Sequence, residues 1–383
     1  MRGSLAVWCE VNDIAVDGHP PSLELHFNMW RDLPSSVDVL DVGFRLKDWR
    51  TIKKFFFLIP SRVEKDQIKD LSRALKNDLT LSAVFNDTLA VGKDTGYSFH
   101  AIKDSSNVLL FEVIYLSVFE DIEFLYVEES DGTVNTILAF SENFFKKFKS
   151  SMGDCYIRFR LELSKSLRQL FSSAYYPLDR VFHTAFYRTD VVEIRVNERR
   201  NFGAALRKAY PDMTTPTISA VHYVLICEIG TELVRAHADF HRMRRLEPRL
   251  WDHYLERLER IDPEKMVIYH WRKSIKTDGV IEDFIALATF RRNFLNPKWL
   301  VLLLLVTVGA LGSGIQALSA SIARRYLPAD FSEAPVQAMA LTALSLVLLV
   351  LFGAFWCLRP RSDQTAAPSV WDRIKALAKK VVP

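Results

Sequence analysis

The sequence predicts an α+β cytosolic region, strand-rich in its first half and strand–helix in its second, followed by a C-terminal two-helix transmembrane hairpin and a short amphipathic tail helix. Three patterns lead to this prediction. Residues 1–151 contain short segments in which apolar and polar residues alternate, which is typical of strands. Residues 152–296 place helix-like segments directly after strand-like ones, and residues 297–358 contain two long apolar runs. A basic tail covers residues 359–383.

The strand-rich first half contains one predicted helix. Its strand-like segments lie between turn-forming clusters and read SLAVWCEV, SLELHFNMW, VDVLDVGFRL, KKFFFLIP, VLLFEVIYLSV, IEFLYVEE and VNTILAF. A helix over residues 62–77 is predicted after Ser61, because Ser61 and Glu64 have the spacing of a capping box. We expect this half to fold as a sheet or a sandwich interrupted by that helix.

In the second half, strands alternate with helices. The predicted strands cover residues 155–164, 190–198, 218–228 and 265–275. Each of the first three runs directly into a helix, and the third of these helices extends to residue 261, with a break or kink at Pro248. A connecting helix over residues 280–296 leads from the last strand to the first apolar run, so the two parts are expected to be joined stiffly.

The two apolar runs cover residues 299–317 and 336–358 and contain no acidic, basic or histidine side chain. As helices they are roughly 28 to 35 Å long, enough for a hydrocarbon core of ~30 Å. Lysine and arginine are concentrated outside the pair, which predicts a multi-pass protein of the inner membrane with both termini cytosolic. The alternative is a buried hairpin inside a large soluble core.

The tail is patterned as an amphipathic helix. In SVWDRIKALAKKVVP, apolar residues fall on one side and basic residues occupy much of the other. Such a helix fits the surface of an anionic inner leaflet. Alternatively, it packs on the cytosolic region or on a neighbouring subunit.

Composition and missing motifs argue against several functions. A net charge of +4 is too mild for a protein that coats itself with nucleic acid. The four cysteines have no CxxC spacing and are interpreted as reduced thiols. Because the sequence contains no phosphate-cradling loop, nucleophile elbow or HExxH motif, we expect no catalytic residues, no cofactor and no enzymatic activity.

A basic cluster is the candidate ligand site. Its residues lie at the end of a predicted strand and on the following helix: Arg195, Arg199, Arg200, Arg207 and Lys208. A strand end, a glycine and a helix start coincide here, and this arrangement suits a phosphate group. The alternative is a solvated surface in which the arginines pair with Glu193 and Glu198.

A second basic run and a histidine pair follow. HRMRRLEPR contributes Arg242, Arg244, Arg245 and Arg249 as a second candidate for an anion. His237 and His241 have the i,i+4 spacing of metal ligands on a helix. A solvated basic helix explains the same pattern, and no metal site is assigned.

Small and polar residues gather in the first apolar run. The candidates for pore lining or helix packing are Thr307, Gly309, Gly312, Ser313, Gly314 and Gln316. Small residues four apart let helices approach closely, and the polar side chains either line a narrow path or bond between helices.

The whole layout, a large cytosolic region without enzyme motifs before two apolar runs, resembles the two-transmembrane effectors of bacterial anti-phage defence. It is most similar to the membrane effector of Hailong-type systems. The resemblance implies an oligomeric, ligand-controlled channel in the lipid bilayer, and an oligonucleotide signal made by a partner nucleotidyltransferase. The basic cluster around Arg199 is then the expected nucleotide site.

Two spans per chain cannot enclose an aqueous path, so the channel hypothesis requires a homo-oligomer, plausibly a tetramer. Two other classes remain open. In one, the hairpin only anchors a binding or scaffold protein. In the other, the soluble region is a hydrolase or transferase with a divergent motif.

Overall fold

The computed structural model describes residues 3–12, 20–31, 38–148, 153–176, 187–211, 214–238, 240–255, 262–275, 279–293, 302, 305–314, 317, 321, 325 and 346. The chain divides into two compact units. Unit 1 comprises Met1–Leu178 and Arg188–Arg292, and unit 2 comprises Asp179–Tyr187 and Asn293–Pro383. Unit 1 contains the sheets and the candidate site.

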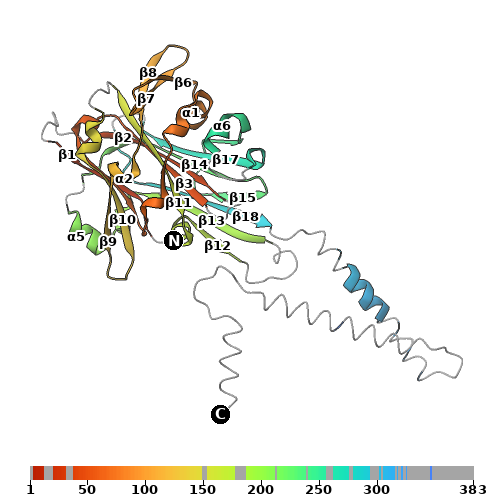
Figure 1. Ribbon diagram of the computed structural model, residues 1–383. Helices are drawn as coiled ribbons and strands as arrows, with labels where there is room; N and C mark the ends of the chain where they lie inside the picture. Colours follow the sequence, from red (N-terminus) through yellow and green to blue (C-terminus); the bar gives the residue numbers. More distant parts are fainter. Residues whose placement is uncertain are drawn as a thin grey trace. The chain divides into compact units, whose positions relative to one another are not determined.

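A large mixed sheet forms the centre of unit 1 (Figure 1). Its strands, in spatial order, are β16 (Arg242–Arg245), β17 (Met266–Ser274), β14 (Thr217–Glu228), β2 (Ser22–Trp30), β3 (Asp38–Leu46), β11 (Asp154–Leu163), β8 (Val108–Ile114), β7 (Ser98–Lys103) and β6 (Leu89–Asp94), and β5 (Ile68–Asp70) also pairs with β11. The pairs β14–β2 and β11–β8 are parallel, and the other pairs are antiparallel.

Two smaller sheets share a core with the central sheet. One has the order β1 (Ala6–Val11), β4 (Ile52–Ile59), β10 (Val134–Phe140), β9 (Ile122–Glu128). The other has the order β12 (Ser172–Tyr175), β13 (Tyr187–Val196), β18 (Phe284–Asn293), β15 (Thr231–Ala236). Phe27 of β2, Phe57 of β4 and Phe290 of β18 are all buried in this core, which therefore joins the three sheets.

Short helices cover part of the opposite face of the central sheet. Figure 1 shows α1 (Asp78–Phe85) and α6 (Pro248–Leu255) side by side there. Leu81 of α1 and Trp251 of α6 belong to a second core, together with Trp30 of β2. Among the described residues of unit 1, the other helical segments are η1 (Trp49–Thr51), η2 (Lys65–Gln67), η3 (Arg73–Leu75), α2 (Val118–Asp121), α3 (Glu142–Lys146), α4 (Lys165–Phe171), η5 (Arg199–Asn201), α5 (Ala204–Ala209) and η6 (Pro263–Lys265).

The central strands are apolar on one face and carry polar residues on the other. Along β2, Leu25 and Phe27 enter the first core, and His26 and Asn28 point to the face that α1 and α6 cover. Because side chains alternate along a strand, the same division recurs in β3, β11, β14 and β17. A row of buried polar side chains thus lies beneath the two helices.

The predicted strand–helix pattern of the second half holds for β11 with α4 and for β13 with α5, but it is wrong from residue 229 onwards. Residues predicted as parts of helices form β15 and β18, which pair with each other through Leu233 and Phe290. Burial of Phe290 and the ladder hydrogen bonds outweigh the helix propensity of these segments. Of the long helix predicted up to residue 261, the described part retains only α6.

The helix predicted over residues 62–77 is also wrong. This segment forms η2, β5 and η3 instead of one continuous helix. A capping box is present, but it joins Glu64 and Gln67 at the start of η2. Ile68 is buried and pairs with Leu161 of β11, so sheet pairing interrupts the helix.

The predicted transmembrane hairpin is a third correction. In the part of the chain that the structure describes, no helix is both long and apolar enough to cross a membrane. Most of residues 297–358, and the whole tail over residues 359–383 with its predicted amphipathic helix, lie outside the described residues.

The boundary predicted at residues 151/152 does not coincide with a boundary between compact units. β14 from the second range pairs with β2 from the first over most of its length. β11 likewise pairs with β3. Both predicted ranges therefore contribute strands to one sheet of unit 1.

Candidate functional site

A cavity of about 260 Å³ lies on the polar face of the central sheet, beneath α1 and α6. The strands β2, β14, β16 and β17 supply its floor. Its lining residues are His26, Asn28, Ala83, Val84, Phe85, Asn86, His222, Val224, His241, Arg242, Arg244, Trp251, Ile268, His270 and Arg272. Seven of these side chains are histidine or arginine, and none is a carboxylate.

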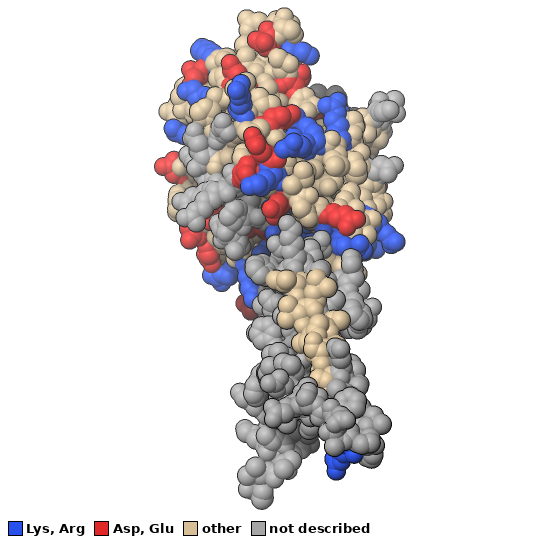
Figure 2. Space-filling view, turned by 90° about the vertical axis from the view of Figure 1, so that its right-hand side faces the viewer, with Lys and Arg blue, Asp and Glu red and all other residues tan. Residues whose placement is uncertain are grey.

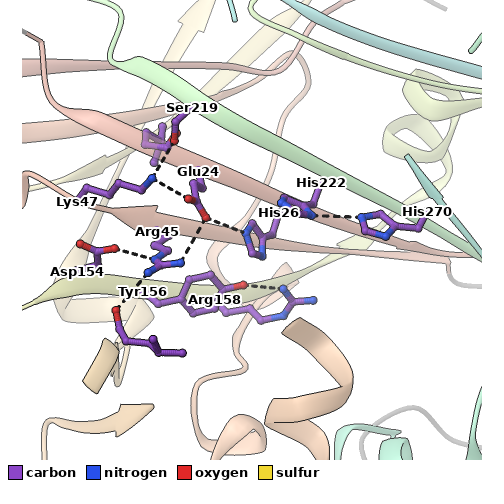
Figure 3. Close-up of polar contacts among 12 residues, drawn as sticks. Glu24, His26, Arg45, Lys47, Asp154, Tyr156, Arg158, Ser219, His222 and His270 are labelled. Atoms are coloured by element: carbon purple, nitrogen blue, oxygen red, sulfur yellow. Dashed lines mark hydrogen bonds and ion pairs between the residues drawn. The ribbon is translucent and has the colours of Figure 1, made fainter. Parts of the chain in front are cut away.

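Strand register brings the histidines together. His222 of β14 lies opposite His26 of β2, and His270 of β17 lies two residues from the partner of His222. The His26 and His222 rings are 4.8 Å apart, and the His222 and His270 rings are stacked at 5.4 Å. His222 Nδ1 and His270 Nε2 lie 3.2 Å apart, so one nitrogen donates to the other (Figure 3).

The three histidines are held in their neutral form. Burial, assisted by the nearby His241, His26, Arg272 and Arg242, lowers the pKa of His270 to about 4. Burial also lowers the pKa of His222 far below its ordinary value, assisted by its two histidine neighbours. His26 is 7% exposed, and burial lowers its pKa although Glu24 acts in the opposite direction.

Glu24 connects the histidines to a group of charges at the edge of the site. Its Oε2 lies 3.9 Å from His26 Nε2, and its two oxygens pair with Arg45 and Lys47 (Figure 3). Burial acts to raise the pKa of Glu24, but the hydrogen bonds and cations around it hold the pKa well below the ordinary value. Glu24 therefore stays ionised, and its charge is matched by its own partners.

Arg158 of β11 lies behind Asn28 and is completely buried. Its Nε and Nη1 donate to the hydroxyls of Tyr254 and Tyr156, both at 2.8 Å. The Asn28 carboxamide, with its oxygen facing the guanidinium, accepts from Arg158 Nη2 at 2.9 Å. These three partners are neutral groups, so the positive charge of Arg158 persists next to the cavity wall.

The neighbouring Arg160 has a carboxylate partner. It donates to both oxygens of Asp41, at 2.6 and 3.0 Å. Asp41 Oδ2 also accepts from Trp30 Nε1 at 2.8 Å and from the Tyr254 hydroxyl at 2.6 Å. Tyr254 therefore links α6 to both buried arginines.

Three arginines add positive charge at the cavity. Arg244 donates to both carboxylate oxygens of Glu247, at 2.7 and 2.9 Å. Arg242 and Arg272 are exposed on β16 and β17, and no described residue forms an ion pair with either. These two guanidinium groups are therefore available to an anion.

The predicted basic cluster is spread over β13, η5 and α5. Arg195 donates to Glu193 and Glu198, at 2.8 to 3.1 Å. Arg200 pairs with Glu198, and Arg199 donates to the Thr215 hydroxyl. In the face shown by Figure 2, Lys and Arg side chains likewise lie among Asp and Glu.

The helix start of the same cluster already has an anionic partner. Glu129, at the end of the β9–β10 hairpin, accepts from the backbone N–H groups of Ala205 and Leu206, at 3.0 and 3.1 Å. A Cβ on Gly203 would collide with the Glu129 carboxylate. Arg207 and Lys208 are exposed on α5. Phosphate binding by this cluster stays a prediction, but a carboxylate occupies the predicted position.

The second basic run divides between the cavity and its surroundings. Arg242 and Arg244 line the cavity, whereas Arg245 donates to the backbone oxygen of Glu264 at 2.8 Å. His241 lines the cavity next to His270, but His237 does not. Within the described ranges, no group of three or more His, Cys, Asp or Glu could hold a metal ion.

The candidates for pore lining or helix packing fall in unit 2. Thr307, Gly309, Gly312, Ser313 and Gly314 belong to the helical residues 305–314. Ser313 Oγ donates to the Gly309 carbonyl at 3.0 Å, within the same helix. Gln316 lies outside the described residues.

Sequence reasoning missed His26, His222, His270 and Arg272. The signal was a polar residue at alternate positions of strands that are otherwise apolar, as in SLELHFNMW and ISAVHYVLICE. Each strand shows one or two such residues, and only the register of β2, β14 and β17 brings them together.

Comparisons with known proteins identify no family. No family model matches the chain, and no curated protein matches it in sequence. The structure of native yeast LTA4 hydrolase is similar at 7% identity and a TM-score of 0.26, covering 71% of this chain and 28% of the hydrolase. The chain thus spans little more than a quarter of that protein, and this similarity carries no argument about fold or activity.

Proposed function

We propose that unit 1 is a sensor that binds a small phosphate-bearing ligand in the histidine- and arginine-lined cavity. The single observation that carries the proposal is the lining itself. It holds three arginines and four histidines without a carboxylate among its described residues. A cavity of this kind attracts anions, because no described carboxylate pairs with Arg242 or Arg272.

The lining has the donors that bind a phosphate group. The guanidinium fork donates two parallel hydrogen bonds to phosphate oxygens, and Arg242 and Arg272 have no ion-pair partner among the described residues. The neutral histidines can donate or accept, and a bound anion raises their pKa. The buried charge of Arg158 adds a fixed positive potential behind Asn28.

Several features support a binding role over catalysis. The described lining contains no serine, cysteine or carboxylate that could act as a nucleophile with a neighbouring histidine. The sequence also has none of the common catalytic motifs. We therefore propose that the chain is a non-enzymatic, ligand-controlled protein.

The proposed output is the one implied by the overall layout of the sequence. Ligand binding would control an oligomeric effector of anti-phage defence that changes membrane permeability, with the signal supplied by a partner nucleotidyltransferase. The resemblance to such effectors supports this output. The alternative is a binding or scaffold protein without such an output. Measuring the membrane potential of expressing cells distinguishes the two, because only the effector changes the potential when its ligand is present.

The binding proposal is tested on the purified full chain by calorimetric titration with pyrophosphate. Arg272→Glu should weaken binding at least tenfold, because a charge-assisted contact contributes about 1.5 to 3 kcal/mol and a repulsive charge is added. Lys273→Glu is the matched control. Lys273 is the next residue of β17, points to the other face and donates to the Asp283 carbonyl at 3.0 Å.

Two results would contradict the proposal. One is a wild-type chain that binds no pyrophosphate. The other is an equal loss of affinity in Arg272→Glu and Lys273→Glu, which would indicate a general effect of net charge. Thermal unfolding of all three proteins checks that both variants fold.

A further inference from the structure

The hydrogen bond between His222 and His270 restricts what these two side chains can offer to a ligand. A neutral imidazole has one N–H donor and one acceptor nitrogen. His222 Nδ1 and His270 Nε2 lie 3.2 Å apart, so one of them donates to the other. If His222 donates, its Nε2 is left as an acceptor and His270 Nδ1 carries a proton. If His270 donates, these two roles are exchanged. In both arrangements the pair presents one donor and one acceptor.

These two remaining nitrogens are open to a ligand. Both rings line the cavity. Within the described part of the chain, His222 Nε2 and His270 Nδ1 have no hydrogen-bond partner, and both remain accessible to solvent. A ligand beside the pair must therefore accept one hydrogen bond and donate another.

The surroundings keep the pair neutral. Burial is the main cause of the lowered pKa values of both rings. The titratable groups that act on the pair come from several elements: His26 and Glu24 of β2, His241, Arg242 of β16 and Arg272 of β17. Glu24, the one acid in this set, is already paired with Arg45 and Lys47. The lining residues of α1 and α6 carry no titratable side chain: Ala83, Val84, Phe85, Asn86 and Trp251.

Arg272 brings the anion to this pair. It lies opposite His222 in the sheet and two residues from His270 along β17. Side chains of opposite residues are about 5 Å apart, so all three lie on one face of the sheet as direct neighbours. An oxyanion that accepts from the Arg272 guanidinium therefore lies within reach of the histidine pair.

We infer that the cavity selects an oxyanion that carries its own proton, a phosphate with a P–OH group, and discriminates against sulfate, because the pair of His222 and His270 needs one donor from the ligand. This inference rests on the proposed phosphate binding and specifies the form of the ligand. The P–OH group donates to the acceptor nitrogen, and a second phosphate oxygen accepts from the N–H. Sulfate has no proton, so it would place an anionic oxygen against the lone pair of that nitrogen.

The selection concerns the phosphate that contacts the pair. The free ion and a protonated phosphate at the end of a larger molecule share the required chemistry. An internal phosphodiester has no P–OH group and is disfavoured at this position. In the test, inorganic phosphate represents the free ion, and pyrophosphate represents the end of a larger group.

The test compares two anions of equal charge and similar shape. At about pH 8, hydrogen phosphate and sulfate are both tetrahedral dianions, and only hydrogen phosphate has a proton. Each anion is used to displace pyrophosphate from the full chain, and the displacement is measured by calorimetry. Hydrogen phosphate should bind the wild type at least tenfold tighter than sulfate, because sulfate leaves the acceptor nitrogen without a donor beside an anion.

His270→Asn removes the restriction. The asparagine amide has two N–H donors, so one can reach His222 while the other donates to the anion. In this variant the preference for hydrogen phosphate over sulfate should fall to about threefold or less. His100→Asn is the matched control, since His100 lies on β7 and does not line the cavity. It should keep the wild-type preference, and thermal unfolding checks that both variants fold.

Three results would count against the inference. If hydrogen phosphate displaces pyrophosphate no better than sulfate does, the selection does not exist, but the proposed function stands because pyrophosphate binds. If His270→Asn keeps the tenfold preference, the histidine pair is not its cause. If the wild type does not bind pyrophosphate at all, the proposed function and the inference both fail.

Discussion

His222 Nδ1 and His270 Nε2 lie 3.2 Å apart, and they join two strands beneath the cavity. Both side chains are neutral because burial holds their pKa values below the ordinary range. An anion in the cavity would stabilise the protonated form of either ring. Proton uptake and ligand binding should therefore be coupled.

The first prediction concerns pH and ligand affinity. The free protein protonates His270 only near pH 4, and an anion raises that pKa. Affinity for an anion should then increase as the pH falls from 8 towards 5, and level off below about pH 4. Calorimetry with sulfate, whose charge is constant over this range, in buffers of different ionisation enthalpy measures the proton uptake. His270→Asn should bind sulfate with a weaker pH dependence, and equal proton uptake by both proteins would refute the coupling.

The second prediction concerns pH and the stability of the free protein. An unfolded histidine has a pKa of about 6.5, and the folded His270 has a pKa of about 4. The unfolded state therefore binds more protons between these values, so the free energy of unfolding falls as the pH drops from 6.5 to 4. The slope is at most about 1.4 kcal/mol per pH unit for each histidine. Urea unfolding of the wild type and of His270→Asn across this range measures the difference.

The third prediction compares how much the two buried arginines, Arg158 and Arg160, contribute to the free energy of unfolding. Arg160→Leu leaves Asp41 buried without its cation and should cost about 3 to 5 kcal/mol. Arg158→Leu breaks hydrogen bonds to neutral groups only, so its cost should be smaller. Denaturant unfolding of both variants tests the order. A larger loss for Arg158→Leu would mean that Arg158 does interact strongly with a carboxylate.

The fourth prediction concerns Gly43 of β3. A Cβ at this position would lie 2.8 Å from Tyr156 Cζ and closer still to its oxygen. Gly43→Ala should therefore displace Tyr156 from Arg158, cost about 1 to 3 kcal/mol in unfolding free energy and weaken pyrophosphate binding. At Gly153 an added Cβ would meet Leu109 at 3.8 Å, an ordinary contact. Gly153→Ala should consequently change the unfolding free energy little.

The fifth prediction compares the two basic regions. Arg199→Glu with Arg200→Glu reverses two charges that lie beside Glu198 and Thr215. If the cavity is the ligand site, this double variant should bind pyrophosphate within about twofold of the wild type, because neither side chain lines the cavity and exposed charges at a distance are largely screened by salt. A tenfold loss of affinity would indicate that the ligand binds at the cluster around Arg199.

Several strands could be predicted from the sequence, but the candidate site could not. The alternation in SLELHFNMW coincides with β2, because its leucines and phenylalanine enter the core. The alternation in TELVRA was overlooked beside a helix-like neighbourhood, and only its pairing with β18 makes it a strand.

The site itself depends on contacts between distant parts of the chain. His26 and His222 meet only because β2 and β14 are parallel neighbours. No local pattern encodes such a pairing, since parallel strands are joined through long connections. A cluster such as RVNERRNFG is conspicuous in sequence, whereas its charges are matched by Glu193 and Glu198 once the chain is folded.

The pairing of β2 with β14 also determines when the cavity can form during synthesis. Ser219 Oγ donates to the Leu23 carbonyl across 196 residues of chain. At roughly 5 to 20 residues per second, the ribosome needs about 10 to 40 seconds to deliver β14 after β2 has emerged. During that interval one edge of β2 is unpaired and exposes apolar side chains, which makes the nascent chain a candidate for chaperone binding. A truncated product that ends before β14 lacks His222 and Val224 of the lining, so premature termination cannot yield a chain with this cavity.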